Sequence, residues 1–384
     1  MPEVATSPVA ALPLWLGLIL TPGLGQRGAY HLLEHFRAPE AIYAASLTEL
    51  ESCRIKAEAA QHLHDGRSAA LGASEAERAR ALGYNIITQG DRAYPELLRE
   101  IFDPPLLLYV QGRVDAVDQF GVAVVGTRHP TVYGRLMAER MGRDLASWGV
   151  TVISGLARGI DAISQKACVE SNGRTVAVLG TGLDIIYPSE NRGLAEAILK
   201  SGGALVSEFP LGTIPAAQNF PIRNRVISGL ALGVLVVEGG EYSGSRITAR
   251  MALEQNRDVY AIPGMATQKQ AWLPNMLIKQ GAKLATEVAD IIDELPSSVR
   301  ARLVPPPAPT LLTRAPGNGD AHEGAAAQQA VLNALRVDEA CHVDEIVDRL
   351  ENKLPAPEVL TLLFDLELGG QVRQFPGKKY LRVS

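Results

Sequence analysis

The feature that most restricts the fold of this chain is a series of short apolar segments that alternate with helical segments over residues 83–295. Runs of four to six apolar residues without polar alternation are typical of strands that are buried on both faces of a sheet. Strands that alternate with helical crossovers predict an α/β fold with a doubly wound parallel sheet. The expected strands are Tyr84–Thr88, Leu106–Val110, Val122–Val125, Thr151–Ser154, Thr175–Leu179, Ala204–Ser207, Gly233–Val237 and Val259–Ile262.

The regions on either side of the predicted sheet indicate smaller domains. Residues 1–82 contain the expected helices Leu14–Leu20 and Ala29–Phe36. The Pro-Gly-Leu-Gly turn between them is either a phosphate-contacting hairpin or a plain interhelical turn. Residues 296–325 are rich in Pro, Gly and Ala, which predicts a linker. Residues 326–384 predict three helices and a hairpin, the layout of a winged helix.

The composition indicates a protein without metal centres or membrane segments. Cys53, Cys168 and Cys341 are odd in number and far apart, so neither a disulfide framework nor a thiolate metal site is expected. The apolar run Leu12–Leu20 is shorter than the ~20 residues that span a bilayer, and no Lys or Arg precedes it as in a signal peptide. We therefore expect a soluble, cytoplasmic protein. Its net charge is −5, so a site for a polyanion must be a local concentration of basic residues.

Small and basic residues follow the predicted strands. Ligands of open α/β sheets bind outside the carboxyl ends of the strands, so these residues should converge on one edge. A single glycine after a strand is usually a turn, and a single arginine is usually a solvated side chain. Five loops with the same chemistry favour an oxyanion or phosphate site. The candidate binding residues are Gly126, Thr127, Arg128, Ser154, Gly155, Arg158, Arg192, Phe220, Arg223, Asn224, Arg225, Ser243, Gly244 and Ser245.

No nucleotide-cofactor motif or catalytic set stands out in the sequence. Of the dinucleotide pattern G-x-G-x-x-G only Gly126 is in place, and no Walker A lysine sequence occurs, so we expect no cofactor. The acidic residues at the same edge are Asp161, Asp184, Glu208 and Glu238. They could act as general acids and bases, or they could cap helices and orient the arginines. Because no Ser-His-Asp or Cys-His set accompanies them, we expect a binding protein and not an enzyme.

Several motifs of the sheet region follow one another in one order. They are Val124–Arg128, Ser154–Asp161, Gly182–Asp184, Phe220–Gly229 and Ile262–Gly264. This series resembles the DNA-processing protein A family, also called DprA or Smf. The resemblance implies an extended Rossmann-like sheet, a SAM-like or helix-hairpin-helix domain before it and a winged helix after it. It also implies a recombination mediator that protects incoming single-stranded DNA in natural transformation and loads the RecA recombinase onto it.

The resemblance further implies which residues line the strand-binding pocket. Gly126–Arg128, Ser154–Gly155 and Phe220–Arg225 would line it, with arginines and backbone N–H groups on phosphates and an aromatic face for stacking. Two positions depart from the family. Ser189 stands where a basic residue is common, which leaves one phosphate contact in doubt. Gln165 replaces a histidine and concerns helix packing more than the pocket.

The resemblance also implies surfaces for protein partners. A homodimer would form through Asn275, Ile278 and Leu284. The RecA recombinase would contact the surface near Leu253 and Asp258. The glycine that the family has shortly before Asn275 is absent here, which concerns the loop at the dimer interface.

Two other classes of protein share part of the pattern. The loop Glu238–Ser245 distantly resembles the phosphate loop of phosphoribohydrolases that cleave nucleoside monophosphates, although Thr248 and Glu254 fit the catalytic register only loosely. A winged-helix transcription regulator with an α/β sensor domain is the third interpretation. Its presumed recognition helix carries Glu358, Asp365 and Glu367. An acidic helix is a poor reader of the major groove.

Overall fold

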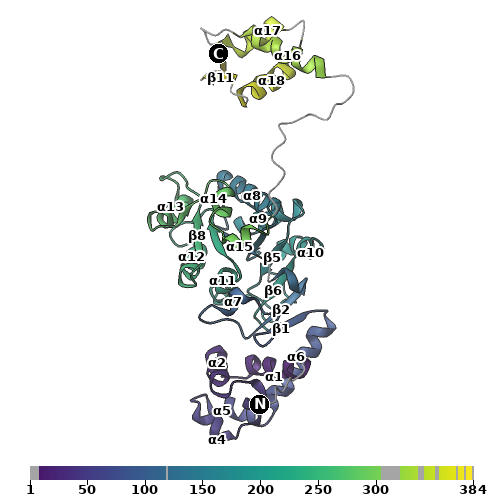
Figure 1. The fold of residues 1–384 in the computed structure, drawn as a ribbon, viewed down its shortest axis with the longest axis vertical. Coiled ribbons are helices and arrows are strands. Elements are labelled where there is room, and N and C mark those ends of the chain that lie inside the picture. Colours follow the sequence, from purple (N-terminus) through teal and green to yellow (C-terminus); the bar gives the residue numbers. More distant parts are fainter. Residues whose placement is uncertain are drawn as a thin grey trace. The chain divides into compact units, whose positions relative to one another are not determined.

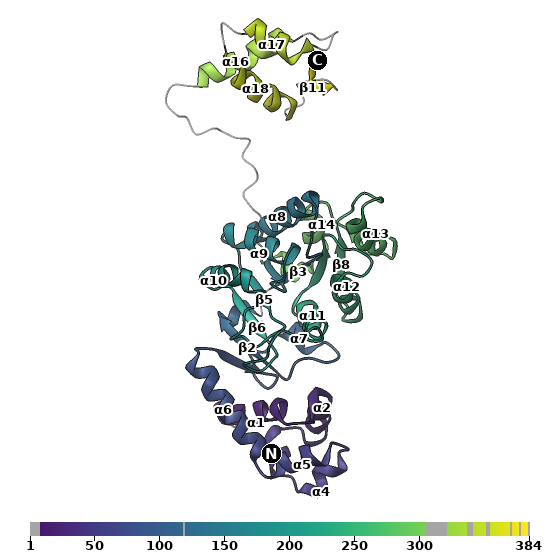
Figure 2. The same cartoon turned by 180° about the vertical axis from the view of Figure 1, so that it is seen from behind.

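Two compact units make up the part of the chain that the structure describes, and they divide between Pro306 and Pro307. The computed structural model describes residues 8–117, 120–303, 321–335, 341–350, 354–368, 371–375 and 378–382. Figures 1 and 2 show a large sheet with flanking helices in the first unit and a small helical domain in the second.

The large sheet has nine strands in the order β1-β2-β6-β5-β4-β3-β7-β8-β9. From β6 to β9 every neighbouring pair is parallel, as the apolar pattern predicted. All eight predicted strands are present, close to their expected ends. The strands are β1 (Asn85–Thr88), β2 (Leu107–Gly112), β3 (Gly121–Val125), β4 (Thr151–Ser154), β5 (Thr175–Val178), β6 (Ala204–Ser207), β7 (Gly233–Val236), β8 (Asp258–Ala261) and β9 (Lys283–Leu284).

Two strands at one edge of the mostly parallel sheet pair antiparallel. β1 pairs antiparallel with β2, and β2 pairs antiparallel with β6. Parallel neighbours need a crossover, usually a helix of several turns. The connection from β1 to β2 contains only the short helix α7 (Glu96–Arg99). β2 in turn pairs with β6 and not with β3, the next strand along the chain. The sheet is therefore mixed at this edge. At the other edge β9 adds a strand too short to give an apolar signal.

Helices cover both faces of the sheet. Side chains alternate along a strand, so Val122 and Val124 of β3 pack on the face that α8 covers, and Ala123 and Val125 pack on the face that α11 covers. Because helices cover both faces, a ligand is expected to bind at the ends of the parallel strands. The helices that surround the sheet are α8 (Val132–Ser147), α9 (Ile160–Glu170), α10 (Arg192–Lys200), α11 (Asn219–Leu230), α12 (Gly244–Glu254), α13 (Trp272–Lys279) and α14 (Ala289–Ile292).

The N-terminal helices have an apolar core of their own and also pack on the sheet. Leu16 lies in one apolar cluster with Tyr109 of β2. The buried carboxylate of Glu75 accepts hydrogen bonds from the Tyr109 hydroxyl at 3.1 Å and from the Leu211 N–H at 2.8 Å. These helices are therefore part of the first unit. They are α1 (Pro8–Leu20), α2 (Gly25–Phe36), α3 (Pro39–Ala44), α4 (Leu47–Ser52), α5 (Ala57–His64) and α6 (Arg67–Ala81).

The start of the predicted linker 296–325 is folded. Ser297–Arg300 form the short helix α15, and Val299 is buried in the same apolar cluster as Leu295. An isolated valine among polar residues gives no periodic signal, which is why the sequence did not indicate this packing. Residues 304–320 of the predicted linker lie outside the described residues.

The second unit has the winged-helix layout that the sequence predicted. Its three strands pair in the order β10-β12-β11, and its apolar core includes Val331, Ile346 and Leu363. None of the helices that the described residues form is long and apolar enough to cross a membrane. The elements are α16 (Ala321–Ala334), β10 (Cys341–His342), α17 (Val343–Leu350), α18 (Ala356–Leu368), β11 (Val372–Phe375) and β12 (Lys379–Arg382).

Candidate functional site

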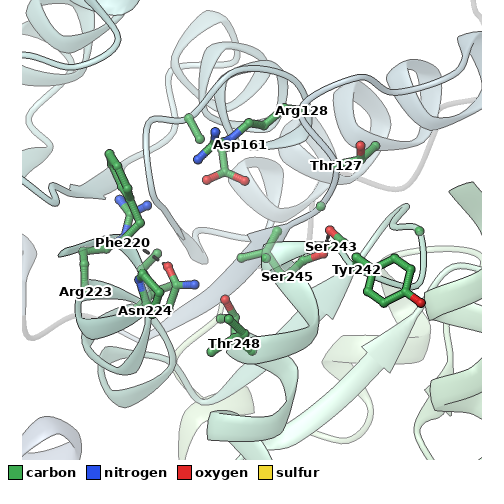
Figure 3. Close-up of a pocket in the computed structure, with 18 of the residues that line it drawn as sticks. Thr127, Arg128, Asp161, Phe220, Arg223, Asn224, Tyr242, Ser243, Ser245 and Thr248 are labelled. Atoms are coloured by element: carbon green, nitrogen blue, oxygen red, sulfur yellow. Dashed lines mark hydrogen bonds between the residues drawn. The ribbon is translucent and has the colours of Figure 1, made fainter. Parts of the chain in front are cut away.

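An open pocket of about 1210 Å³ lies at the carboxyl ends of the parallel strands (Figure 3). The loops after β3 through β8 contribute to its wall. The chain order reverses between β3 and β7, which is the position at which doubly wound sheets bind ligands. The predicted binding residues that line this pocket are Gly126, Thr127, Arg128, Phe220, Arg223, Asn224, Ser243, Gly244 and Ser245.

Arg128 is an exposed cation of this pocket. Its guanidinium carbon lies 5.7 Å from the centroid of the Phe220 ring, within cation–π range. Phe220 in turn packs against Tyr187, with ring centroids 5.7 Å apart. Arg128 forms no ion pair with any residue that the structure describes. Its charge is therefore available to an anion beside an aromatic pair.

Arg223 is a buried cation that is held by backbone carbonyls. Its Nη1 donates to Gly155 O at 2.7 Å and to Val178 O, and its Nε donates to Asn224 Oδ1 at 3.2 Å. A Cβ at position 155 would lie 2.6 Å from this nitrogen, so only glycine permits the approach. Burial lowers the pKa of Arg223 to about 10, the Asp161 carboxylate raises it, and the nearby Arg128 guanidinium lowers it. Two guanidiniums thus stand close together at the pocket.

Asp161 is the buried carboxylate of the pocket. Burial raises its pKa, whereas Arg223 and the Gly155 N–H, which donates to it at 3.1 Å, act in the opposite direction. Figure 3 shows the carboxylate between Arg128 and the start of α12. Asp161 therefore holds the loop after β4 in place and balances part of the charge of Arg223.

The N-terminus of α12 supplies neutral donors to the same pocket. Ser243 precedes the helix, and its side chain makes no capping bond to the helix N–H groups. Its hydroxyl lies instead 2.7 Å from that of Ser245, and no atom lies within 4 Å of the place where a Cβ at Gly244 would be. Because the first N–H groups of a helix have no partner within the helix, this end attracts an anion.

Arg225 departs from its predicted place. Its side chain is only 5% exposed and points toward the N-terminal helices, where it contacts Glu208 and lies 3.1 Å from Gln26 Oε1 and 3.3 Å from Asp103 Oδ2. Residues two apart on a helix project about 200° apart, so Arg225 and Arg223 leave α11 on nearly opposite sides. Arg225 therefore joins α11 to α2 and does not line the pocket.

The contact between Glu208 and Arg225 predicts a pH dependence of folding. Burial raises the pKa of Glu208 from 4.5 to about 7, against the lowering by Arg225. The folded chain thus binds this proton more tightly than the unfolded chain. The free energy that protonation of Glu208 adds to folding is fully present below pH 4.5 and is lost as the pH rises through about 7. We expect the free energy of unfolding of the wild type to fall relative to that of Glu208→Gln, by on the order of 2 kcal/mol, between about pH 5 and about pH 8. Urea unfolding at both pH values measures this, and parallel profiles would contradict it.

The remaining predicted arginines and Ser154 do not line the main pocket. Arg158 borders a small neighbouring cavity with Gly155, but its guanidinium pairs with Glu190 at 2.7 and 2.9 Å. Arg192 is exposed at the start of α10. The buried Ser154 hydroxyl donates to Val124 O at 2.7 Å and so braces β4 against β3. Of the residues that were predicted from their position after a strand, only some therefore lie together in the pocket.

Gln165, where the sequence departs from the family, is a buried brace behind the pocket. Its Oε1 accepts from the Leu156 N–H at 3.2 Å. Its Nε2 donates to Thr175 Oγ1 at 3.1 Å and to Val176 O at 3.2 Å. The glutamine therefore ties α9 and the loop after β4 to β5, in line with an effect on packing and not on ligand contact.

Glu238 closes the N-terminus of α8 and is not exposed to the pocket. Its two carboxylate oxygens accept from the Thr131 hydroxyl at 2.6 Å and from the Thr131 N–H at 2.9 Å, and its backbone O accepts from Thr127 N at 2.8 Å. A Cβ at Gly134 would lie 2.1 Å from the carboxylate. Glu254 pairs with Arg250 at 2.8 Å on an exposed face of α12. Neither carboxylate lines the pocket.

Among the pocket residues that the sequence prediction missed are three large side chains. Tyr242, Lys269 and Trp272 all line the cavity. Tyr242 lies inside the Gly-Gly-Glu-Tyr-Ser-Gly loop whose serines were predicted, so its loop position was a usable signal. Lys269 and Trp272 follow β8 only after a long loop, and reading the first residues after each strand does not reach them.

The predicted protein-contact residues have different environments. Asn275 closes its loop on Gly264, whose O accepts at 2.9 Å and whose N–H donates at 3.1 Å. Ile278 packs partly against the main core, whereas Leu284 on the edge strand β9 is 50% exposed. Leu253 is exposed on α12. Asp258 pairs with Lys283 at 3.0 Å.

Fold and site together define a class of protein. It is an α/β protein of Rossmann-like topology whose switch-point pocket carries arginines, an aromatic pair and a helix N-terminus, with a winged helix after it. The sequence matches the family model for DNA recombination-mediator protein A over residues 85–296, and the model for the DprA winged helix domain over residues 305–378. The chain belongs to the DNA recombination-mediator protein A family.

Relatives cover most of the chain. Protein Smf of Escherichia coli (strain K12) is 43% identical over 300 residues, which is 78% of each chain. DNA processing protein DprA of Bacillus subtilis (strain 168) is 43% identical over 218 residues, 56% of this chain and 73% of its own. The structure of DprA from Streptococcus pneumoniae matches 74% of this chain and 96% of its own with a TM-score of 0.65 at 32% identity. A structure of DprA from Helicobacter pylori, which concerns its single-stranded DNA binding mode, matches 55% of this chain and 94% of its own with a TM-score of 0.50 at 27% identity.

Proposed function

We propose that this protein binds single-stranded DNA in the switch-point pocket and acts as a recombination mediator. The observation that carries the proposal is Arg128, an exposed guanidinium without an ion pair among the described residues, beside Phe220 at the ends of the parallel strands. A phosphate can pair with this cation, and an unpaired base can stack on the ring. The relative from Helicobacter pylori, which has a single-stranded DNA binding mode, supports this choice of ligand.

The same geometry disfavours duplex DNA and chemical turnover. The bases of a duplex already stack on one another, so Phe220 and Tyr187 offer them little. The pocket carboxylate Asp161 is held by Arg223 and Gly155, and Glu238 is engaged at α8. We infer that the protein works by holding a strand and not by cleaving one.

The partners follow from family membership and from exposed apolar residues. In this proposal the protein is a cytoplasmic homodimer that protects incoming strands in natural transformation and loads RecA onto them. Leu284 on the edge strand is the exposed apolar residue at the proposed dimer interface. Leu253, exposed near the C-terminal end of α12, is the proposed contact for the recombinase.

Fluorescence anisotropy with labelled DNA tests the proposed ligand. We expect a single strand to bind at least about tenfold more tightly than a duplex of the same sequence, because only the single strand adds base stacking to phosphate contacts. The affinity should fall with salt, with a slope of about −0.7 in log K against log salt for each phosphate held. Equal affinity for the duplex, or an affinity that salt does not change, would refute the proposal.

A further inference from the structure

Two large aromatic side chains at the edge of the pocket are exposed to solvent. Tyr242 is 92% exposed and Trp272 is 38% exposed, yet both line the same cavity as Arg128. Exposed apolar side chains are informative where they gather at a concave polar site, because such sites bind ligands.

The two aromatics stand on segments that are fixed to each other. Gly239 N donates to Gln270 O at 2.7 Å, and Leu273 N donates to Gly239 O at 2.8 Å. The loop after β7, which carries Tyr242, is thereby tied to the start of α13, which carries Trp272. A stacking surface built on such a frame needs little ordering when a ligand binds.

Cations accompany this second pair of aromatics. The Arg246 guanidinium carbon lies 5.8 Å from the centroid of the Trp272 ring, and Lys269 lines the pocket beside it. Neither cation forms an ion pair with a described residue. Glu241 also lines the pocket, and its backbone O accepts from Arg246 at 3.5 Å. The combination of aromatic and cation repeats that of Phe220 and Arg128.

The two combinations lie on opposite sides of the pocket. Figure 3 shows Phe220 and Tyr242 at opposite sides, with Ser243, Ser245 and Thr248 between them. The cavity volume of about 1210 Å³ exceeds the range of about 300–1,000 Å³ that is usual for one small ligand. More than one nucleotide therefore fits across it.

We propose that Tyr242 and Trp272 form a second base-stacking site, so that a single strand crosses the pocket from Phe220 to Trp272. One base stacks on each side, Arg128 and Arg246 hold the adjoining phosphates, and the N-terminus of α12 lies beneath the strand between them. The proposal rests on the proposed function, because it names how the same pocket takes the same ligand. It sets a minimum length that a strand must have to reach both sides.

Oligothymidylates of two lengths test the second stacking site. With strands of about 3 and about 12 nucleotides, Trp272→Ala should weaken the longer one by about tenfold and the shorter one by less than about twofold. Trp272→Phe keeps a stacking ring and should bind like the wild type. Strand binding should quench tryptophan emission in the wild type, and this quenching should be lost in Trp272→Phe but kept in Trp148→Phe, since Trp148 lies at the end of α8 against the core.

Tyr242→Ala guards against a folding effect, because that side chain is almost fully exposed. It should lower affinity for the longer strand in the same direction as Trp272→Ala. If both variants bind the longer strand like the wild type while Arg128→Ala does not, the second site is refuted and the proposed function stands. If Arg128→Ala also binds both strands like the wild type, the proposed function itself fails.

Discussion

Arg128→Ala should weaken the binding of single-stranded DNA by about tenfold to a hundredfold, more than the removal of residues 304–384 does. The loss of a hydrogen bond to a charged group costs about 1.5–3 kcal/mol, and Arg128 has no carboxylate among the described residues that already uses its charge. The exposed face of the winged helix carries Lys378 and Lys379, but also Glu358 and Asp365. Titration of both variants at one salt concentration measures the difference.

Arg158→Ala is the matched control for this comparison. Arg158 is an exposed arginine near the same pocket, but Glu190 already neutralises it, so its removal should change affinity by less than about twofold. The truncation begins at residue 304 because Val299 and Leu295 belong to the core of the first unit. If the truncated chain loses more affinity than Arg128→Ala, the winged helix is the main DNA site.

If the proposed homodimer forms through β9, Leu284→Glu should convert it into a monomer. Leu284 lies on the two-residue edge strand β9 and is half exposed, so an isologous interface there would bury it against its symmetry mate. Two carboxylates facing each other without cations would cost about 3 kcal/mol or more, which raises the dissociation constant by more than about a hundredfold. Light scattering across a concentration series measures this.

Ile278 is a poorer position for the same test. It packs partly against the core of the sheet, so a charge there would destabilise the fold as well as an interface. Leu253→Glu is the suitable control, because Leu253 is equally exposed but lies on α12 at the proposed recombinase contact. That variant should stay dimeric. A dimer of Leu284→Glu would place the interface elsewhere on the surface.

The course of the sheet could be predicted because its signals are local. Each strand from β3 to β8 is centred on consecutive apolar residues, and this property is decided within four or five positions. The carboxyl ends of parallel strands share an edge by construction. The convergence of the loops that carry Arg128, Phe220 and Ser243 therefore followed from strand direction alone.

The direction of single side chains could not be predicted in the same way. Arg223 and Arg225 occur in one motif, yet one lies at the pocket and the other contacts α2, because an α-helix turns by about 100° per residue. Glu238 belongs to the loop with Gly240 and Ser243. Its carboxylate, however, accepts hydrogen bonds from the N–H and the hydroxyl of Thr131, more than a hundred residues away. Such contacts depend on where distant segments meet, which no local pattern records.

The buried Glu75 limits where this chain can be shortened from its N-terminal side. The family match begins at residue 85, which suggests a cut just before β1. That cut would leave the Tyr109 hydroxyl and the Leu211 N–H without their acceptor, and Arg225 without Gln26. It would also open the apolar surface that Leu16 covers. The sheet and the helices before it are thus one folding unit, and a soluble fragment should begin no later than α1.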